Sequence, residues 1–310
     1  MKRRALMLGF ATCLAWSGAA FGYCRTTTCD PAADCAVDPE ACCLVDSKGC
    51  DRNGLPLVWT TSCLSFSVQE DGSKRAGVSA RQMEGIVERA FSAWENVECS
   101  GGPVSISVES LGQVACDAVE YNSNDSNANV WMFRDVDWPH EAAVREEGDL
   151  LDANAIAVTT VSYNWRTGEL YDADVEFNSA DMDFSTGEDD VTLDIQAVAT
   201  HEAGHFLGLD HSKEPDVTMD AGYLPGSLGP RTLEADDEAG LCAIYPPDRD
   251  TILTTSCDPR HGFGSDCAGG CSLYGGVATN EAGGNGATPS WIVLGLLGVF
   301  GGIVRRRRAV

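Results

Sequence analysis

The segment 201–211 constrains this chain more than any other part of its sequence. It reads His-Glu-Ala-Gly-His-Phe-Leu-Gly-Leu-Asp-His, a H-E-x-x-H-x-x-G-x-x-H pattern. His201 and His205 are four positions apart, so on a helix they share one face and can reach one metal ion. Gly208 permits a sharp turn after that helix, and His211 then returns as a third nitrogen ligand. Three protein ligands leave one position of a tetrahedral zinc ion open, which is the arrangement of a catalytic site.

Glu202 lies beside these histidines and is not needed as a ligand. It is therefore free to take a proton from a zinc-bound water. Histidines on a helix are often only polar surface, but three of the five histidines in this chain fall at ligand spacing, with a glutamate and a glycine in register. This favours a catalytic zinc, and a degenerate, non-catalytic zinc module remains the alternative.

The residues that follow carry a family resemblance. Leu209-Asp210-His211-Ser212 is followed by Met219, eight positions beyond the third histidine, and by Tyr223; a later stretch reads Leu233-x-x-Asp236-Asp237-x-x-Gly240-Leu241-x-x-Ile244-Tyr245. These motifs resemble those of the matrixins, the matrix-metalloproteinase branch of the metzincins. The resemblance spans roughly 55–247 and is specific over 197–245. It implies that Met219 forms a hydrophobic floor under the zinc ligands, whereas an ordinary core methionine is the alternative.

The resemblance also implies a fold and a mode of substrate binding. The expected fold is α/β (α+β), a metzincin-like catalytic domain with a twisted, mainly parallel mixed sheet, one antiparallel edge strand and three main helices. In the family, substrate adds as a strand along that edge, for which 155–161 is the candidate here. Ala157 and Tyr223 are accordingly expected to bind substrate, and 220–231 to wall the specificity pocket.

Two features depart from the family pattern. The Pro-Arg-Cys-Gly stretch whose cysteine blocks zinc in matrixin propeptides does not occur in this sequence. Latency by that route is therefore in doubt. Only His140 and His261 lie outside the motif, so one zinc ion is expected instead of two.

Hydrophobic periodicity predicts secondary structure in the order that the family would require. Strands are expected at Leu55–Val68, Val104–Val108 and Asn129–Phe133, with a hairpin of 156–163 and 171–177 whose Ala173, Val175 and Phe177 point inward. Helices are expected at 79–97, at 193–209 and at 232–245, before Pro246. Ser79 and Gln82 form a capping box for the first helix, and Thr192 is a candidate cap for the second.

The chain is strongly acidic, with 47 Asp and Glu against 21 Lys and Arg, a net charge of −26. Nucleic acid is excluded as an expected partner, because phosphate binding requires clustered Lys and Arg. Some carboxylates are candidates for structural calcium, which matrixins usually carry. The Asp-rich segment 181–190 is one candidate, and a solvated acidic loop is the alternative.

The N-terminus predicts export. Residues 1–22 read as a signal peptide, with Lys2–Arg4 basic, 5–16 apolar and Ala20-Phe21-Gly22 at the cleavage site. Of 14 cysteines, Cys13 falls in this peptide and Cys271 in a tail motif; the remaining 12 predict up to six disulfides in an oxidising compartment. Half of these twelve crowd into the Cys-rich segment 23–54, for which a zinc cluster is the rival interpretation.

The C-terminal part predicts a sorting signal. A catalytic domain at 55–247 would be followed by a flexible linker at 248–290 that contains Gly269-Gly270-Cys271-Ser272, then by an apolar run, 291–304, and Arg305–Arg308. This end, residues 291–310, resembles the sorting tail of bacterial surface proteins of myxobacteria, which a dedicated enzyme processes near the cysteine. A plain C-terminal membrane anchor is the alternative.

Together these features predict an exported zinc metalloendopeptidase that cleaves protein or peptide substrates at the cell surface, at the outer membrane or outside the cell. A non-catalytic surface binding or adhesion module that retains the zinc fold is one alternative. A structural surface protein whose Cys-rich segment is the functional part is another.

Overall fold

The computed structural model describes residues 21–29, 43–140, 155–250, 256–266 and 303–309. Most of the expected signal peptide, the tail motif around Cys271 and residues 291–302 of the apolar run lie outside these ranges.

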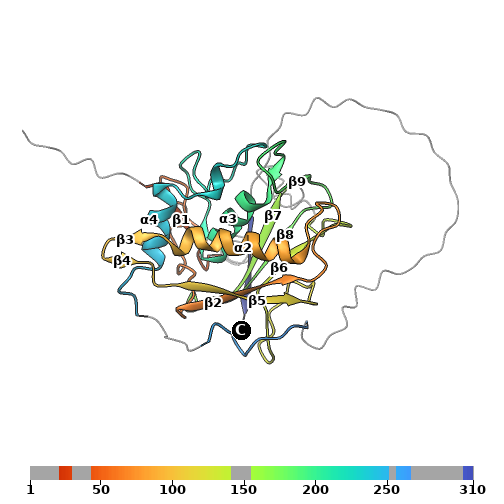
Figure 1. Ribbon diagram of the computed structural model, residues 1–310. Coiled ribbons are helices and arrows are strands. Elements are labelled where there is room, and N and C mark those ends of the chain that lie inside the picture. The colour runs from red at the N-terminus through yellow and green to blue at the C-terminus, as the bar shows by residue number, and fades with distance from the viewer. Residues whose placement is uncertain (1–20, 30–42, 141–154, 251–255, 267–302, 310) are drawn as a thin grey trace, which may run out of the picture.

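A six-stranded sheet forms the centre of the domain (Figure 1), in the order β12-β7-β8-β6-β2-β5. Its strands are β2 (Cys63–Gln69), β5 (Ser107–Val114), β6 (Val130–Phe133), β7 (Ala157–Asn164), β8 (Leu170–Phe177) and β12 (Ile303–Ala309). Every neighbouring pair is parallel except the hairpin β7–β8. The predicted mixed, mainly parallel sheet is confirmed, and β7 is the expected antiparallel strand. It is not the edge strand that was expected, because β12 pairs outside it and runs in the same direction.

Three α-helices occur in the described ranges, α2 (Ala80–Glu95), α3 (Ile195–Phe206) and α4 (Ala235–Ile244), with a short 3₁₀ helix η1 (Gly229–Arg231). The predicted capping box of Ser79 and Gln82 is present at the start of α2. The indole Nε1 of Trp94 donates to the Thr200 carbonyl at 2.8 Å, which ties α2 to α3.

Short strand pairs fasten the connecting segments. β1 (Cys24–Arg25) pairs with β11 (Leu209–Asp210), β9 (Phe184–Ser185) with β10 (Leu193–Asp194), and β3 (Glu98–Cys99) with β4 (Gly102–Pro103). The first pair is the one nearest the histidine motif. It joins the N-terminal segment, residues 21–29, to the chain just before His211.

Aromatic rings fill the core between the helices and the sheet. Phe91 of α2 lies 5.0 Å from Phe206 of α3 and 5.5 Å from Trp131 of β6, measured between ring centroids. The inward-facing residues predicted for β8 (Ala173, Val175 and Phe177) are all buried in this core. Burial of such large apolar surfaces is the main favourable contribution to folding.

The opposite face of the sheet is polar and also buried. Asp172, Asp174 and Glu176 of β8 are each about 1–2% exposed. Asn129 bridges two strands there, because its amide donates to the Ser65 carbonyl at 2.8 Å and accepts from the Ala173 amide at 3.0 Å. Burial raises the pKa of Asp174 to about 8, although hydrogen bonds from two backbone amides oppose that change.

Two predicted strands begin later than periodicity suggests. Residues 55–62 lie outside the strands of the sheet; Pro56 forms an isolated bridge with Thr27, and Val58 with Glu169. Near the second strand, the amide of Val104 bonds to the Val97 carbonyl at 3.2 Å instead of to a neighbouring strand. In both places the alternation of apolar and polar residues reflects the burial of one face of the segment. It does not show that the backbone belongs to a strand of the central sheet.

Part of the expected linker belongs to the folded domain. Cys257 is disulfide-bonded to Cys63, and Cys242 to Cys99. The guanidinium of Arg249 donates to the carbonyls of Trp59 and Thr61. The described residues 248–250 and 256–266 therefore extend the domain beyond residue 247.

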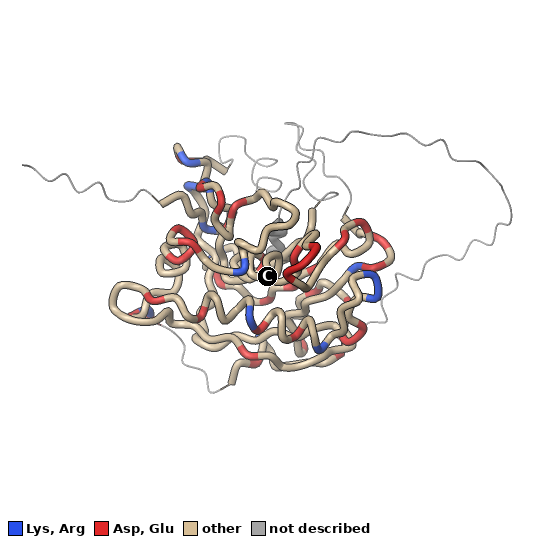
Figure 2. The backbone as a smooth tube through the Cα atoms, turned by 45° about the horizontal axis from the view of Figure 1, so that its top comes forward, with Lys and Arg blue, Asp and Glu red and all other residues tan. Residues whose placement is uncertain are grey.

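The acidic residues are spread over the loops of the described chain, and basic positions are fewer (Figure 2). Among the described residues no helix is both long and apolar enough to span a membrane.

The N-cap of α3 differs from the predicted Thr192, which is exposed. Asp194 takes this role: its carboxylate accepts from the Ala197 amide at 2.8 Å. The same carboxylate, 0% exposed, receives two hydrogen bonds from Arg231, at 2.6 and 2.8 Å. Spacing in sequence cannot reveal a cap that depends on an arginine 37 residues away.

We therefore expect Asp194→Ala to lower the free energy of unfolding by about 2–4 kcal/mol, because it removes a helix cap and leaves the partner of a buried ion pair unsatisfied. Thr192→Ala, the matched control, should change it by less than about 0.5 kcal/mol. Urea unfolding of both variants, with disulfides intact, measures the difference. Equal losses in the two variants would contradict the assignment of the cap.

Candidate metal centre

Helix α3 places two of the predicted ligands on a buried surface. His201 is 6% exposed and His205 is 0% exposed. Their Nε2 atoms are 3.1 Å apart, and the Nε2 atoms of His205 and His211 are 3.3 Å apart. The structure thus brings all three histidines of the sequence motif together, with His211 on the more open side.

Backbone carbonyls fix the protonation of two of these rings. Nδ1 of His201 lies 2.6 Å from the Thr218 carbonyl, and Nδ1 of His205 lies 3.0 Å from the Leu209 carbonyl. A carbonyl oxygen can only accept, so each neutral ring carries its hydrogen on Nδ1. The Nε2 atoms of His201 and His205 are therefore lone-pair donors, as metal ligation requires.

The arrangement fits zinc. Zn–N bonds of about 2.0–2.1 Å in a tetrahedral site place two ligand nitrogens about 3.3–3.4 Å apart, close to the two separations seen here. Nitrogens without hydrogens repel one another at such distances, so a cation between them would relieve the repulsion.

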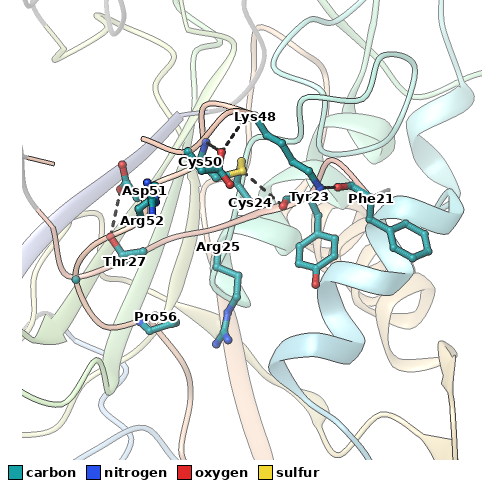
Figure 3. Close-up of a pocket in the computed structure, with 12 residues that line it drawn as sticks. Phe21, Tyr23, Cys24, Arg25, Thr27, Lys48, Cys50, Asp51, Arg52 and Pro56 are labelled. Atoms are coloured by element: carbon teal, nitrogen blue, oxygen red, sulfur yellow. Dashed lines mark hydrogen bonds between the residues drawn. A yellow bond between two sulfur atoms is a disulfide. The ribbon is translucent and has the colours of Figure 1, made fainter. Parts of the chain in front are cut away.

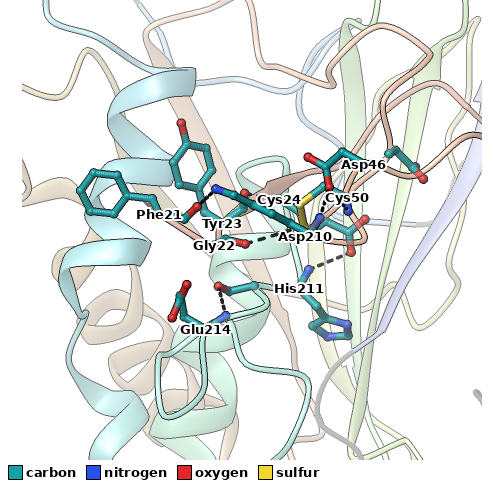
Figure 4. The surroundings of a disulfide bond; sticks show 12 residues. Phe21, Gly22, Tyr23, Cys24, Asp46, Cys50, Asp210, His211 and Glu214 are labelled. Carbon is teal, nitrogen blue, oxygen red and sulfur yellow. Dashed lines mark hydrogen bonds between the residues drawn. A yellow bond between two sulfur atoms is a disulfide. The ribbon is translucent and has the colours of Figure 1, made fainter. Parts of the chain in front are cut away.

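The N-terminal segment positions the third ligand. Gly208 has φ of +94°, and a Cβ there would lie 2.7 Å from the Leu57 carbonyl, so glycine is required at this turn. The following strand β11 pairs with β1, where Cys24 lies opposite Asp210. A disulfide from Cys24 to Cys50 anchors β1 (Figure 4), and His211 comes directly after the paired strand.

The same N-terminal segment borders a pocket of about 470 Å³ (Figure 3). Lys48 and Arg52 line it together with Asp46 and Asp51, so its charge is mixed. Burial lowers the pKa of the Arg25 guanidinium, which also lines it. None of the three histidines contributes to this pocket, which is therefore separate from the metal centre.

Glu202 is fully buried, with one carboxylate oxygen held and one without a partner. The hydroxyl of Thr159 in β7 donates to Oε2 at 2.6 Å. Oε1 has no hydrogen-bond partner among the residues that the structure describes. Burial raises the pKa of Glu202 to about 8, and the Thr159 hydrogen bond opposes this rise. A cation beside the carboxylate would lower that pKa again.

Met219 packs directly beneath the metal-binding helix and is 1% exposed. A Cβ added at Gly204 of α3 would meet the Met219 sulfur at 2.2 Å. The turn is held by Asp237 of α4, whose two carboxylate oxygens accept from the Thr218 amide at 2.9 Å and the Met219 amide at 3.0 Å. Asp237 thus fixes the carbonyl of Thr218 that orients His201.

Asp236, the neighbouring carboxylate, binds the stretch around the third histidine, His211-Ser212. One of its oxygens accepts from the Ser212 hydroxyl and the other from the Gly22 amide, both at 2.6 Å. The Asp236-Asp237 pair was visible in the sequence only as part of a family pattern. Thr159 and the N-terminal segment gave no sequence signal, because their partners are distant along the chain.

The two expected substrate-binding residues have different surroundings. Ala157 of β7 is 0% exposed and belongs to the core, so its side chain does not reach the surface. Tyr223 accepts from the Asp194 amide at 3.0 Å and donates to the Ser227 carbonyl at 2.6 Å. It lines a small cavity beside His201, together with Val198 and Pro230.

A second group of possible metal ligands lies outside the histidine motif. Within the described ranges only one further group of three converges, Cys63, Glu109 and Cys257, and its cysteines form a disulfide. The acidic side chains of 181–190 form no such group in this part of the chain. Calcium there stays a prediction.

We expect Gly204→Ala to lower the free energy of unfolding by about 1–3 kcal/mol, because the new methyl group would displace Met219. Zinc affinity should fall as well, since the floor below His201 and His205 would shift. Gly85→Ala on α2 is the matched control: its Cβ would meet only Arg89, at 3.6 Å, and alanine favours helix. Thermal unfolding and zinc titration of the two variants test this, and a neutral Gly204→Ala would contradict the close packing.

Comparisons with known proteins agree with this geometry. The family model described as Matrixin matches residues 136–246. Metalloendoproteinase 1-MMP of Arabidopsis thaliana is 26% identical over 200 residues, covering 63% of this chain and 46% of that protein. Interstitial collagenase of Oryctolagus cuniculus is 26% identical over 189 residues, covering 61% and 33%. Macrophage metalloelastase of the same species is 39% identical over 69 residues, covering 20% and 15%.

In each case this chain matches less than half the length of the relative. The matched part includes the three histidines, Glu202, Met219 and Asp237, which lie within 136–246. Residues 136–246 of this chain are therefore similar to the Matrixin family, and the chain resembles the named metalloendoproteinase over the stretch given above.

Proposed function

We propose that this protein is an exported zinc metalloendopeptidase. The observation that supports it most is the convergence of the Nε2 atoms of His201, His205 and His211 on the helix that carries Glu202, a buried carboxylate whose Oε1 has no hydrogen-bond partner among the described residues. Buried polar atoms without partners are rare and call for an explanation, and catalysis is one. The relatives named above are a metalloendoproteinase, a collagenase and a metalloelastase, which is consistent with peptide-bond hydrolysis.

Each residue then has a distinct task. His201, His205 and His211 hold the ion through Nε2. Zinc, when bound, supplies Lewis acidity that polarises a carbonyl and acidifies water. Glu202 receives the proton of the attacking water on its free Oε1, while Thr159 holds Oε2 in place. The same carboxyl then delivers that proton to the leaving nitrogen, so no covalent intermediate is needed.

Substrate would bind where β7 passes the active-site helix. The backbone edge of β7 opposite β8, which β12 occupies in the structure, would supply the hydrogen bonds of a sheet edge, a mode of recognition that gives affinity without selecting side chains. Since the side chain of Ala157 is buried, its contribution would come from the backbone. The cavity beside His201, walled by Tyr223, would take one substrate side chain, and its small size favours a short one.

A non-catalytic binding module is the second candidate. It would need the three histidines but not a buried carboxylate held by Thr159. Burying an ionisable group costs free energy, so its retention beside the ligands favours turnover.

We predict that Glu202→Ala keeps one zinc ion per chain, as counted by elemental analysis, and lowers kcat by about 10²–10⁴-fold, the usual contribution of a general base. Exposed Glu88 on α2 provides the control, and Glu88→Ala should keep both zinc and activity. Cleavage of a quenched-fluorescent peptide library measures kcat. Full activity of a zinc-loaded Glu202→Ala protein would exclude the mechanism.

We also propose that the exported protein is processed near Cys271 and attached to the cell surface. Cys271 is the odd cysteine once Cys13 leaves with the signal peptide, and an apolar run and four arginines follow it. The mature protein should therefore end near Cys271. Mass spectrometry of the protein isolated from the cell surface measures this end. A chain that ends at Val310 would indicate a permanent anchor instead.

A further inference from the structure

Strand β7 has two edges, and they differ in what occupies them. One edge is taken by β8 in the antiparallel hairpin. The other edge is paired in parallel with β12, in a register that runs from Ile303 opposite Val158 to Ala309 opposite Asn164. β12 is therefore the outermost strand of the sheet, beyond the edge that was expected to receive substrate.

This edge lies close to the proposed catalytic carboxylate. Thr159, the β7 residue that holds Glu202, is itself in register with Val304. The candidate substrate edge, 155–161, shares residues 158–161 with the stretch paired to β12. A strand edge presents a single row of outward N–H and C=O groups, so two added strands cannot pair with it at once.

Charge also favours this pairing. The four arginines Arg305–Arg308 contribute +4 to a net charge of −26, so the rest of the chain carries −30. Attraction between a basic segment and an acidic domain raises the rate and stability of docking, most strongly at low salt.

We propose that the segment Ile303–Ala309 is an autoinhibitory strand, which occupies the substrate edge of β7 until the C-terminal part of the chain is removed. This inference rests on the proposed peptidase function. It provides a means of latency in a sequence that has no Pro-Arg-Cys-Gly stretch. Processing near Cys271 would remove the strand together with the tail, so that release at the cell surface and activation become one event.

The chain between the domain and β12 allows this docking. Between Asp266 and Ile303 lie 36 residues, which reach roughly 120 Å when extended, far more than a domain of this size requires. A tether of 36 residues keeps its end at an effective concentration of about 1 mM or below. A tail that binds with a Kd of about 100 µM as a free peptide would then give at most about tenfold latency.

Four forms of the protein test the proposal: three of full length and one truncated. The first is wild type and the second stops after Gly302. The third carries Arg306→Pro and Arg307→Pro, which removes backbone donors from the strand. The fourth, its matched control, carries Arg306→Lys and Arg307→Lys and so keeps the donors and the charge. Peptide cleavage gives kcat/KM, and thermal unfolding verifies that all four are folded.

We expect the truncated and proline forms to exceed wild type in kcat/KM by about tenfold, and the lysine form to match wild type. The free peptide Ile-Val-Arg-Arg-Arg-Arg-Ala should inhibit the truncated form by raising KM at constant kcat. Values within twofold for wild type and the truncated form would overturn the proposal.

A binding measurement separates this inference from the proposed function. Fluorescence anisotropy of the labelled peptide, with the truncated form carrying Glu202→Ala, needs no catalysis. If none of the four forms cleaves any peptide, the proposed peptidase function is wrong. Docking at the β7 edge would still be supported if the labelled peptide binds saturably and a proline-substituted peptide does not. Equal binding of the two peptides would overturn the docking as well.

Discussion

The candidate metal centre of this domain depends on holding the ring nitrogens of three histidines close together. His201 and His205 are brought together by one turn of α3, and His211 returns after Gly208. Without a cation, such an arrangement is unfavourable, and it persists because the surrounding residues fix each ring separately. Carbonyls orient two rings through Nδ1, and a two-stranded pairing fixes the backbone before the third.

Two adjacent carboxylates of α4 extend this support outward. Asp237 holds the Met219 turn, which lies below the metal-binding helix and includes the carbonyl that orients His201. Asp236 holds Ser212, directly after the third histidine. The Cys-rich segment, which the sequence suggested to be stapled by disulfides, supports the same stretch through the pairing of Cys24 with Asp210.

The sheet contributes at both of its faces and at one edge. Its apolar face packs against α2 and α3 around Phe91, Phe206 and Trp131. Its polar face is held by Asn129 and by the acidic residues of β8. The β7 edge passes beside Glu202, and there the same backbone groups would serve substrate or the C-terminal strand β12, but not both.

The sequence by itself predicted the three histidines that converge, the place of Glu202 beside them on the helix, the position of Met219 and the mixed sheet, because these depend on spacings within short segments. It also predicted which face of β8 points inward, because apolar residues alternate with polar ones along a strand that is buried on one face. Only the tertiary structure decided that Asp194 caps α3 instead of Thr192 and that Thr159 holds Glu202. It alone placed residues 256–266 on the domain and β12 on the β7 edge. Most of these contacts join residues that are distant along the chain. In the case of the helix cap, two nearby residues were both suitable. The local sequence pattern therefore could not predict any of these contacts.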